Sequence, residues 1–371
     1  MIPLNRPFFE NISKENSFIH NFEHKGFYCR TLYSSRDGLN AIYSSLYKER
    51  GPLRVAVSPL TCFVALYPII NNGHIPVFVD INANTFNIEE TKLNETKVDV
   101  IQIIHLGGNP VNINPIITWA DCNNIIVIED CAQALGSTYE DRLVGTFGDY
   151  TVYSLLKNLY APYGALMISK KEIEINILHT TFVKQTVLYY KKIKKYLESK
   201  LSYKDSIYSL LLFSLLKIKS ENLSISYDGR IKLIDPSIDI IGNLYNLDKI
   251  VEKRLEVADT IIKNVDSTKF LIQEELPNAK SNRNRLIFRS NFVLAKNIIN
   301  SLRKAGIAAN NLTQNYLCGF QESISDNAYL NKYYDKLDNY EELNKYIFSI
   351  PCSPGLRENE INYIIKTLNK L

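Results

Sequence analysis

The residues best suited to chemistry lie near the middle of the chain. The apolar run Ile125–Ile128 is followed by Glu129 and Asp130, and Lys157 comes further along. A carboxylate at the carboxyl end of an apolar strand lies where open α/β sheets bind their ligands. Pyridoxal phosphate needs such a carboxylate beside its pyridine nitrogen and an amine that forms a Schiff base. Asp130 and Lys157 therefore predict a pyridoxal phosphate site, although Asp130 could instead cap the next helix.

Two motifs around these residues resemble a known family. Val127–Gly136 reads VIEDCAQALG and is similar to the "viEDaAQAhGa" motif of the DegT/DnrJ/EryC1/StrS sugar aminotransferases. Val144–Asp149 reads VGTFGD and is similar to the family's "vGsfGD". The resemblance implies that Asp130 pairs with the cofactor's ring nitrogen, that Gln133 contacts the ring and its 3′ oxygen, and that Lys157 is the Schiff-base lysine.

Further matches extend the resemblance over most of the chain. They are Ile75–Ile81, Thr85–Ile88 and Ile104–Pro110, which resemble "kPVfvDid", "tfnid" and "vHlyGqp". The similarity runs from about residue 2 to residue 354, with a poorly matched, helix-like segment at 170–235. Because the motifs occur in the family's order, the resemblance rests on more than any single motif.

The resemblance implies a fold and a domain division. We expect an α/β protein of fold type I, with a large domain at 1–239 that holds a mainly parallel mixed sheet flanked by helices. A small α+β domain is expected at 240–371. The family also implies a homodimer that moves an amino group from an amino acid, in our expectation L-glutamate, to a keto group of a nucleotide-linked sugar for a surface polysaccharide or related glycan.

The hydrophobic pattern agrees with such a fold. Short β runs bounded by Gly, Pro, Asn or Asp alternate with helix-sized segments in the first half, which is typical of a mainly parallel sheet. The expected strands are Arg54–Val57, Val77–Val79, Val100–Ile104, Ile125–Ile128, Tyr150–Tyr153, Ala165–Ile168 and, near the C-terminus, Arg285–Phe288. The expected helices are Arg36–Lys48, Thr61–Ile70, Asn243–Asn264, Ala295–Ala305 and Glu358–Leu368.

A phosphate group would bind at the N-terminus of the first of these helices, where backbone N–H groups and the helix dipole favour an anion. Tyr33–Leu39 resembles the family's phosphate turn "SGTaAL", with Ser35 and Arg36 in place of glycine and threonine. The guanidinium of Arg36 suits phosphate geometry, or it points into solvent. Ser154 matches a further phosphate contact of the family.

The chain departs from the family pattern in three places. Two residues separate Ser154 from Lys157, where many relatives have four, so the segment that carries the lysine is short. Cys62 stands where many relatives place an aromatic ring over the cofactor. The family's "GyNyRm" segment, whose asparagine reaches the partner's phosphate, is missing; Leu233–Ile238 stands there, with Ser237 as a weak candidate.

Substrate contacts are less clear from the sequence. His105 ends an apolar strand and is either a pocket residue or a hydrogen-bonded structural histidine. Arg285, together with Arg283 and Arg289, either binds a substrate diphosphate or forms a solvated basic face.

Composition describes an ordinary globular enzyme. Hydrophobic residues make up 46% of the chain, charged residues 22%, and the net charge is +4, which suggests no nucleic-acid partner. The six cysteines and five histidines show no metal-ligand spacing and no disulfide framework, so we expect no metal site. No signal peptide is apparent, and we expect a cytoplasmic protein. The lysine-rich segment 184–219 either contacts an anionic membrane surface or, in our preferred interpretation, forms a solvated helix that packs on the sheet or on a second subunit.

Other functions remain open at this point. The same chemistry on a small phosphorylated ketone is one, because the substrate side of the sequence has diverged. A dehydratase of the same family is another. A cofactor-free scaffold or regulator is a third, although such a protein has no reason to hold Asp130, Gln133, Ser154 and Lys157 together.

Overall fold

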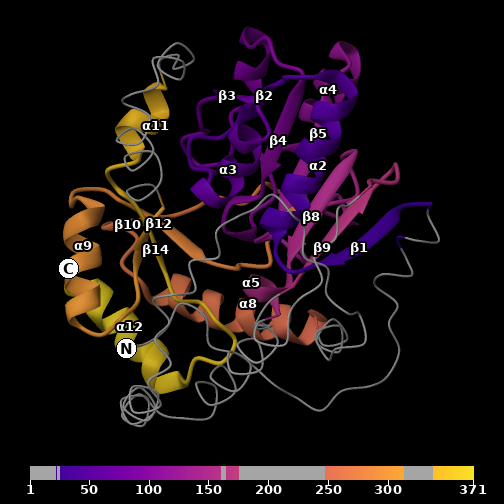
Figure 1. Ribbon diagram of the computed structural model, residues 1–371. Coiled ribbons are helices and arrows are strands. Elements are labelled where there is room, and N and C mark those ends of the chain that lie inside the picture. The colour runs from indigo at the N-terminus through magenta and orange to yellow at the C-terminus, as the bar shows by residue number, and fades with distance from the viewer. Residues whose placement is uncertain (1–21, 23–25, 160–163, 175–246, 313–336) are drawn as a thin grey trace, which may run out of the picture.

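The computed structural model describes residues 22, 26–159, 164–174, 247–312 and 337–371. In this part of the chain, a seven-stranded sheet with helices on both sides forms the N-terminal unit, and a four-stranded sheet with its own helices forms the C-terminal unit (Figure 1). A small three-stranded sheet joins the two halves of the sequence. None of the described helices combines the length and the apolar character needed to span a bilayer.

The seven-stranded sheet is mainly parallel, as the sequence predicts. Its order is β1-β9-β8-β5-β4-β2-β3, and all neighbours from β8 to β3 are parallel, whereas β9 pairs antiparallel with β8 and with β1. The strands are β1 (Tyr28–Leu32), β2 (Arg54–Val57), β3 (Ile75–Phe78), β4 (Val100–Ile104), β5 (Ile126–Cys131), β8 (Tyr150–Ser154) and β9 (Ala165–Ser169). The carboxyl ends of β4 and β5 therefore lie side by side.

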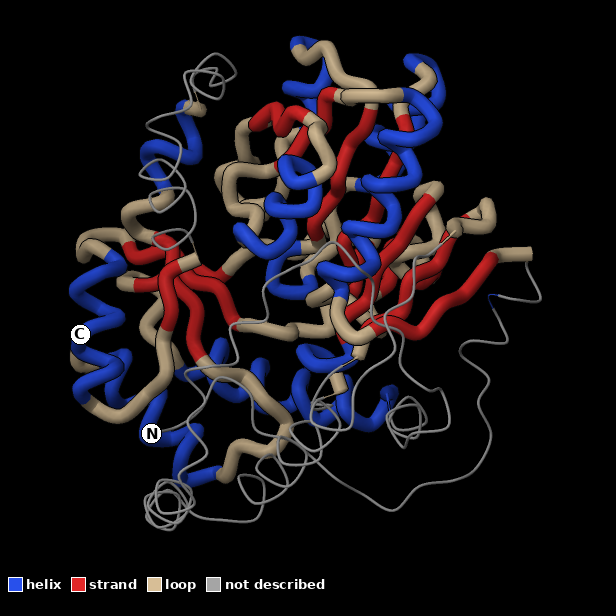
Figure 2. The backbone as a smooth tube through the Cα atoms, viewed as in Figure 1, coloured by secondary structure: helices blue, strands red, loops and turns tan. Residues whose placement is uncertain are grey.

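Helices cover both faces of this sheet (Figure 2). The strands alternate their buried side chains between two cores, as a period of two residues requires. Ile128 packs with α2 and α3, whereas Val127 and Cys131 pack with α4. These helices are α2 (Ser35–Arg50), α3 (Phe63–Asn71) and α4 (Ile113–Asn123), and the connections include α5 (Leu155–Asn158) and the 3-10 turns η1 (Glu90–Glu95) and η2 (Leu106–Gly108).

Helix α2 lies very close to the sheet at its N-terminal turn. A Cβ atom added to Gly38 would lie 2.8 Å from the Cγ1 of Val152 on β8, so this position has room only for glycine. Ser34 caps the helix by accepting a hydrogen bond from the N–H of Asp37. The first turn of α2 is thereby held against the sheet beside β8.

The C-terminal unit has its own core between a sheet and three helices. Its sheet has the order β10-β12-β14-β13. The elements are α8 (Leu247–Asn264), β10 (Phe270–Ile272), β12 (Leu286–Ser290), α9 (Ala295–Lys304), β13 (Asn310–Asn311), α11 (Asp338–Leu343), β14 (Ile347–Ile350) and α12 (Glu358–Asn369); β11 (Ala279–Lys280) pairs with the hairpin β6 (Thr138–Tyr139) and β7 (Arg142–Leu143).

Two features tie this unit to the large sheet. Helix α8 packs Leu247 and Ile250 into the core of the large unit and Val257 and Ile261 into that of the small one. Asp80, beyond the end of β3, accepts hydrogen bonds from backbone N–H groups at the start of α11. The expected division at residue 239 falls outside the described residues, as do Ser237 and the segment 184–219.

The expected elements are present, with shifted ends. The most consequential shift is in β5, which continues through Cys131 because Asp130 pairs with Ile104 on β4 and with Val152 on β8. Glu129 and Asp130 are therefore neighbours within a strand, and their side chains point to opposite faces of the sheet.

Candidate active site

A cavity of about 370 Å³ opens at the carboxyl ends of β4 and β5, between the first turn of α2 and the small unit. This position follows the rule for open α/β sheets. The cavity brings together most of the residues that the sequence singles out: Ser35, Arg36, Cys62, Asp130, Gln133, Lys157 and Arg285.

Asp130 forms part of the cavity floor and is 5% exposed. One carboxylate oxygen accepts a hydrogen bond of 3.1 Å from the N–H of Ala132. Burial raises the pKa of Asp130, and the nearby charge of Lys157 acts in the opposite direction. A buried carboxylate of this kind is stabilised in its charged form by a cationic N–H group placed in the cavity. A protonated pyridine nitrogen would be such a group.

Lys157 lies on α5, a helix of four residues that follows β8 directly. Its amine belongs to the cavity lining, and burial lowers its pKa, while the negative charge of Asp130 acts to raise it. A lysine with a lowered pKa supplies more of the neutral amine, which is the form that attacks an aldehyde carbon. Arg285, across the cavity, also lowers the pKa of this amine.

The N-terminal turn of α2 provides an anion site at another part of the wall. Ser35 Oγ and Arg36 Nε are buried polar atoms with no hydrogen-bond partner among the residues that the structure describes. Burying polar groups without partners is costly, so their presence in a cavity indicates a ligand that completes their hydrogen bonds. A phosphate at a helix N-terminus satisfies this requirement. The lining thus fits the aldehyde, the ring nitrogen and the phosphate of pyridoxal phosphate.

Three further expected residues have different places in this site. Gln133 lines the cavity, and its Oε1 accepts a hydrogen bond from the N–H of Gly107. Cys62, the residue directly before α3, also lines the cavity and is half-buried. Ser154 is not part of the lining; its Oγ accepts a hydrogen bond from the N–H of Lys157 and caps α5.

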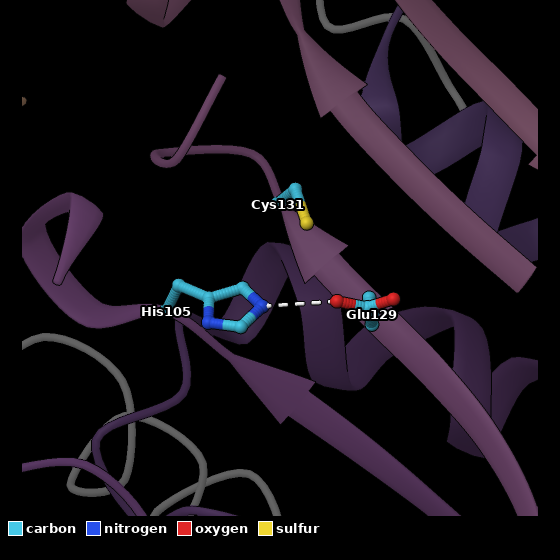
Figure 3. A group of neighbouring side chains, drawn as sticks. All are labelled: His105, Glu129 and Cys131. Atoms are coloured by element: carbon cyan, nitrogen blue, oxygen red, sulfur yellow. Dashed lines mark ion pairs between the residues drawn. The ribbon is translucent and has the colours of Figure 1, made fainter. Parts of the chain in front are cut away.

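His105 does not reach the cavity. It is fully buried, its Nδ1 accepts a hydrogen bond from the N–H of Val111, and its Nε2 lies 3.4 Å from Glu129 Oε2 (Figure 3). This placement matches the structural alternative for His105, because the residue packs on the α4 side of the sheet and the cavity lies on the other side.

Glu129 and Cys131 stand next to His105, so three potential metal ligands meet here (Figure 3). Both oxygens of Glu129 are already occupied, because they accept hydrogen bonds from the backbone N–H groups of Gly145, Phe147 and Gly148. Burial also raises the pKa of the Cys131 thiol, which disfavours the thiolate that binds metals. The cluster is better explained as a fixed support for the 145–148 loop.

The small unit contributes a wall that sequence reasoning largely missed. Lys296, Asn300 and Arg303 project from one face of α9 into the cavity, and Asn310 and Asn311 follow from β13. Their spacing of four and three residues on a helix would have placed the first three on one face. Among the described residues of the lining, five of the charged ones are basic and Asp130 alone is acidic. Arg283 and Arg289 are not part of this lining, and Arg283 pairs with Glu275.

The fold and this cavity define a class: an α/β protein whose parallel strands end at a site fitted to a phosphorylated aldehyde. The chain belongs to the DegT/DnrJ/EryC1/StrS aminotransferase family, which it matches over residues 21–369.

Individual relatives agree with this assignment. The chain is 34% identical over 158 residues to GDP-perosamine synthase of Escherichia coli O157:H7, a match that covers 40% of this chain and 43% of the relative. It is 46% identical over 85 residues to the lipopolysaccharide biosynthesis protein RfbH of Salmonella typhimurium, covering 22% and 20%. The matches thus span less than half the length of these curated relatives. The aminotransferase TlmJ from Streptoalloteichus hindustanus has the same fold, with a TM-score of 0.71, 17% identity and coverage of 100% and 98%.

Proposed function

We propose that this protein is a pyridoxal phosphate-dependent aminotransferase. It moves an amino group from an amino acid, with L-glutamate as the proposed donor, to a keto group of a nucleotide-linked sugar that is used for a surface polysaccharide or related glycan. The observation that carries the proposal is that Lys157 and buried Asp130 line one cavity together with Ser35 and Arg36, whose Oγ and Nε atoms have no hydrogen-bond partner among the described residues.

Each of these residues has a distinct task. Pyridoxal phosphate, when bound, supplies an electron sink for the charge left by the donor's α-proton. Asp130 holds the proton on the ring nitrogen, which the sink requires. Lys157 takes the α-proton as a general base and delivers it during the second half-reaction, and its lowered pKa favours the neutral amine that this exchange needs. Ser35 and Arg36 bind the phosphate.

The proposed acceptor class rests on the opposite wall. Lys157 and Arg36 serve the cofactor, so Arg285, Lys296 and Arg303 remain as basic residues for a second anion. A nucleotide-linked sugar carries a diphosphate, which is matched by several cations spread along a wall. The names of the relatives from Escherichia coli and Salmonella typhimurium point to sugar and lipopolysaccharide chemistry as well. A homodimer and a cytoplasmic location belong to the proposal on the strength of the family alone.

The proposal is tested with two half-reactions. The protein is loaded with pyridoxal phosphate, treated with L-glutamate, freed of small molecules and then offered nucleotide-linked keto sugars. We expect 2-oxoglutarate in the first step, and in the second the return of the aldehyde absorbance together with an amino sugar identified by mass spectrometry.

Other outcomes of this experiment overturn the proposal in distinct ways. Bound cofactor that reacts with no amino acid excludes amino transfer. Return of the aldehyde absorbance with small keto phosphates alone changes the acceptor class. A sugar product that has lost water and gained no nitrogen identifies a dehydratase.

A further inference from the structure

Lys157 lies on an unusually short helix. Helix α5 has four residues, and only two residues separate Ser154, at the end of β8, from Lys157. A single helical turn is not stable by itself, because the conformational entropy lost in forming it exceeds the stabilisation from its one hydrogen bond. Contacts from elsewhere in the protein must therefore fix the backbone of Lys157.

These contacts come from the small unit. The side-chain amide of Asn284 donates a hydrogen bond of 3.0 Å to the backbone carbonyl of Lys157, and it also lies 3.3 Å from Asn158 Oδ1. The amide of Asn282 donates to the same Oδ1 at 3.0 Å and to the carbonyl of Leu135 at 2.8 Å. Asn282 and Asn284 are thus joined to the lysine and to the residue that follows it.

Asn158 connects these hydrogen bonds to the part of the cavity lining near Asp130. Its side chain is fully buried, and its Nδ2 donates to the carbonyls of Ala132 and Ser154. Ala132 lines the cavity two residues after Asp130. Arg254 of α8, also fully buried, donates from its two terminal nitrogens to the backbone carbonyls of Asn158 and Asn282. One network therefore connects the lysine, the small unit and the wall beside Asp130.

The turn that presents the two asparagines is itself tightly determined. We call residues 282–284 the Asn282–Asn284 turn. Asn282 Oδ1 accepts a hydrogen bond from the N–H of Asn284, and Arg283 between them has a φ of 48°, in the left-handed region. Non-glycine residues adopt this region when their surroundings require it, and such residues cluster at functional sites. A Cβ on Gly108 would collide with Asn282 Oδ1, so the approach also depends on that glycine.

We propose that Asn284, supported by Asn282, is a positioning residue that holds the backbone of Lys157 so that its amine faces the cofactor. This inference rests on the proposed role of Lys157. The same turn leads directly to Arg285, whose N–H donates to the carbonyl of Gly107 and whose side chain lines the cavity. The Asn282–Asn284 turn therefore sets the position of Lys157 relative to Arg285, which lines the cavity from the small unit.

The test replaces the amide donor without changing charge. Asn284→Leu keeps the branching and the number of heavy atoms of the side chain, although leucine is the larger residue, and it cannot donate to Lys157. The matched control is Asn291→Leu, an exposed asparagine of the small unit whose amide donates to the carbonyl of Thr268 at 2.8 Å. Asn284→Ala serves as the second variant because it adds no bulk if the leucine interferes with folding.

Two measurements distinguish positioning from stability. The first is the rate of the glutamate half-reaction in protein saturated with cofactor, where a displacement of the amine costs tenfold or more, and up to about 100-fold. The second uses cofactor-free protein and follows the acetylation of Lys157 against pH by peptide mass spectrometry. Because burial lowers the pKa of this amine, release of the backbone moves the midpoint upward, toward that of an exposed lysine.

The proposal predicts both changes in the Asn284 variants and neither in Asn291→Leu. A lower melting temperature with an unchanged half-reaction rate and an unchanged acetylation midpoint overturns it and leaves only a structural role. Failure of the proposed function looks different, because the wild-type protein itself then shows no half-reaction, whereas the acetylation midpoints still report how the turn holds the lysine.

Discussion

The two walls of the cavity are built in contrasting ways. On the large unit, Asp130 is buried and Lys157 is half-buried, and hydrogen bonds connect both residues to the segments that follow β5 and β8. On the small unit, Lys296 and Arg303 are exposed residues of one helix, and Lys296 has no hydrogen-bond or ion-pair partner among the described residues. The buried wall suits reaction chemistry, which requires fixed geometry and shifted pKa values, and the exposed wall suits substrate choice.

This contrast explains why the two walls should respond differently to substitution. A buried group changes both the electrostatics and the geometry of the reaction, so its loss affects turnover by orders of magnitude. An exposed cation gains little from a single contact in water, so its loss affects binding by a smaller factor. Substitutions on each wall therefore test whether the two walls have these different roles.

The largest effect is expected for Asp130→Asn. Removing the charge lets the ring nitrogen lose its proton, and turnover should fall by about 10²- to 10⁴-fold. The melting temperature should stay the same or rise, because the buried charge is gone and asparagine can still accept from the N–H of Ala132. Asp121→Asn on the exposed face of α4 is the control. Near wild-type turnover with a lower melting temperature would instead assign Asp130 a structural role, through the hydrogen bond that it accepts from the N–H of Ala132.

An intermediate effect is expected on the exposed wall. Lys296→Gln and Arg303→Gln should each raise KM for the nucleotide-linked sugar by about 5- to 30-fold, the value of one charge-assisted contact. The glutamate half-reaction should change much less, because these residues lie away from the reacting atoms. Lys304→Gln, on the same helix but outside the cavity lining, controls for net charge. If all three variants had the same KM for the nucleotide-linked sugar, Lys296 and Arg303 would have no specific role in binding it.

The smallest effect on turnover is expected for Glu129→Gln, on the opposite face of β5 from Asp130. Glutamine cannot accept all the N–H groups of Gly145, Phe147 and Gly148, so the free energy of unfolding should fall by about 2–3 kcal/mol. Turnover of the folded, cofactor-loaded protein should change less than about threefold, since the carboxylate lies outside the cavity. Urea unfolding against Glu140→Gln, an exposed control, measures the first effect. A loss of turnover as large as that of Asp130→Asn would show that the two faces of the strand are not separate.

Much of the wall that the large unit contributes could be predicted from the sequence. Strands such as Val100–Ile104 have apolar runs with clear boundaries, and their ends agree with the structure. Asp130 and Lys157 follow from position relative to such strands and from motif similarity. Both signals are local, so they do not depend on knowing which distant segments meet.

The remaining features depend on long-range contacts that the sequence does not encode locally. The hydrogen bond from Asn284 to Lys157 joins residues 127 positions apart. The role of Glu129, which faces away from the cavity, became clear only from the pairing of β5 with both neighbours, which fixes the face that each side chain occupies. The hydrophobic pattern of α9 marks its buried face and does not show what its polar face lines. Among the described strands, β1 pairs with β9 alone, a contact between segments far apart in the sequence.

We propose Lys157 as the lysine that binds the cofactor covalently. The most direct measurement is reduction of the cofactor-loaded protein with sodium borohydride, followed by digestion and mass spectrometry of the labelled peptide. Labelling of Lys157 in the wild type and in Lys170→Ala, an exposed lysine that pairs with Asp149, is the predicted result, with no label in Lys157→Ala. A label on any other lysine of the wild-type protein, or bound cofactor that borohydride leaves unattached, would contradict the account.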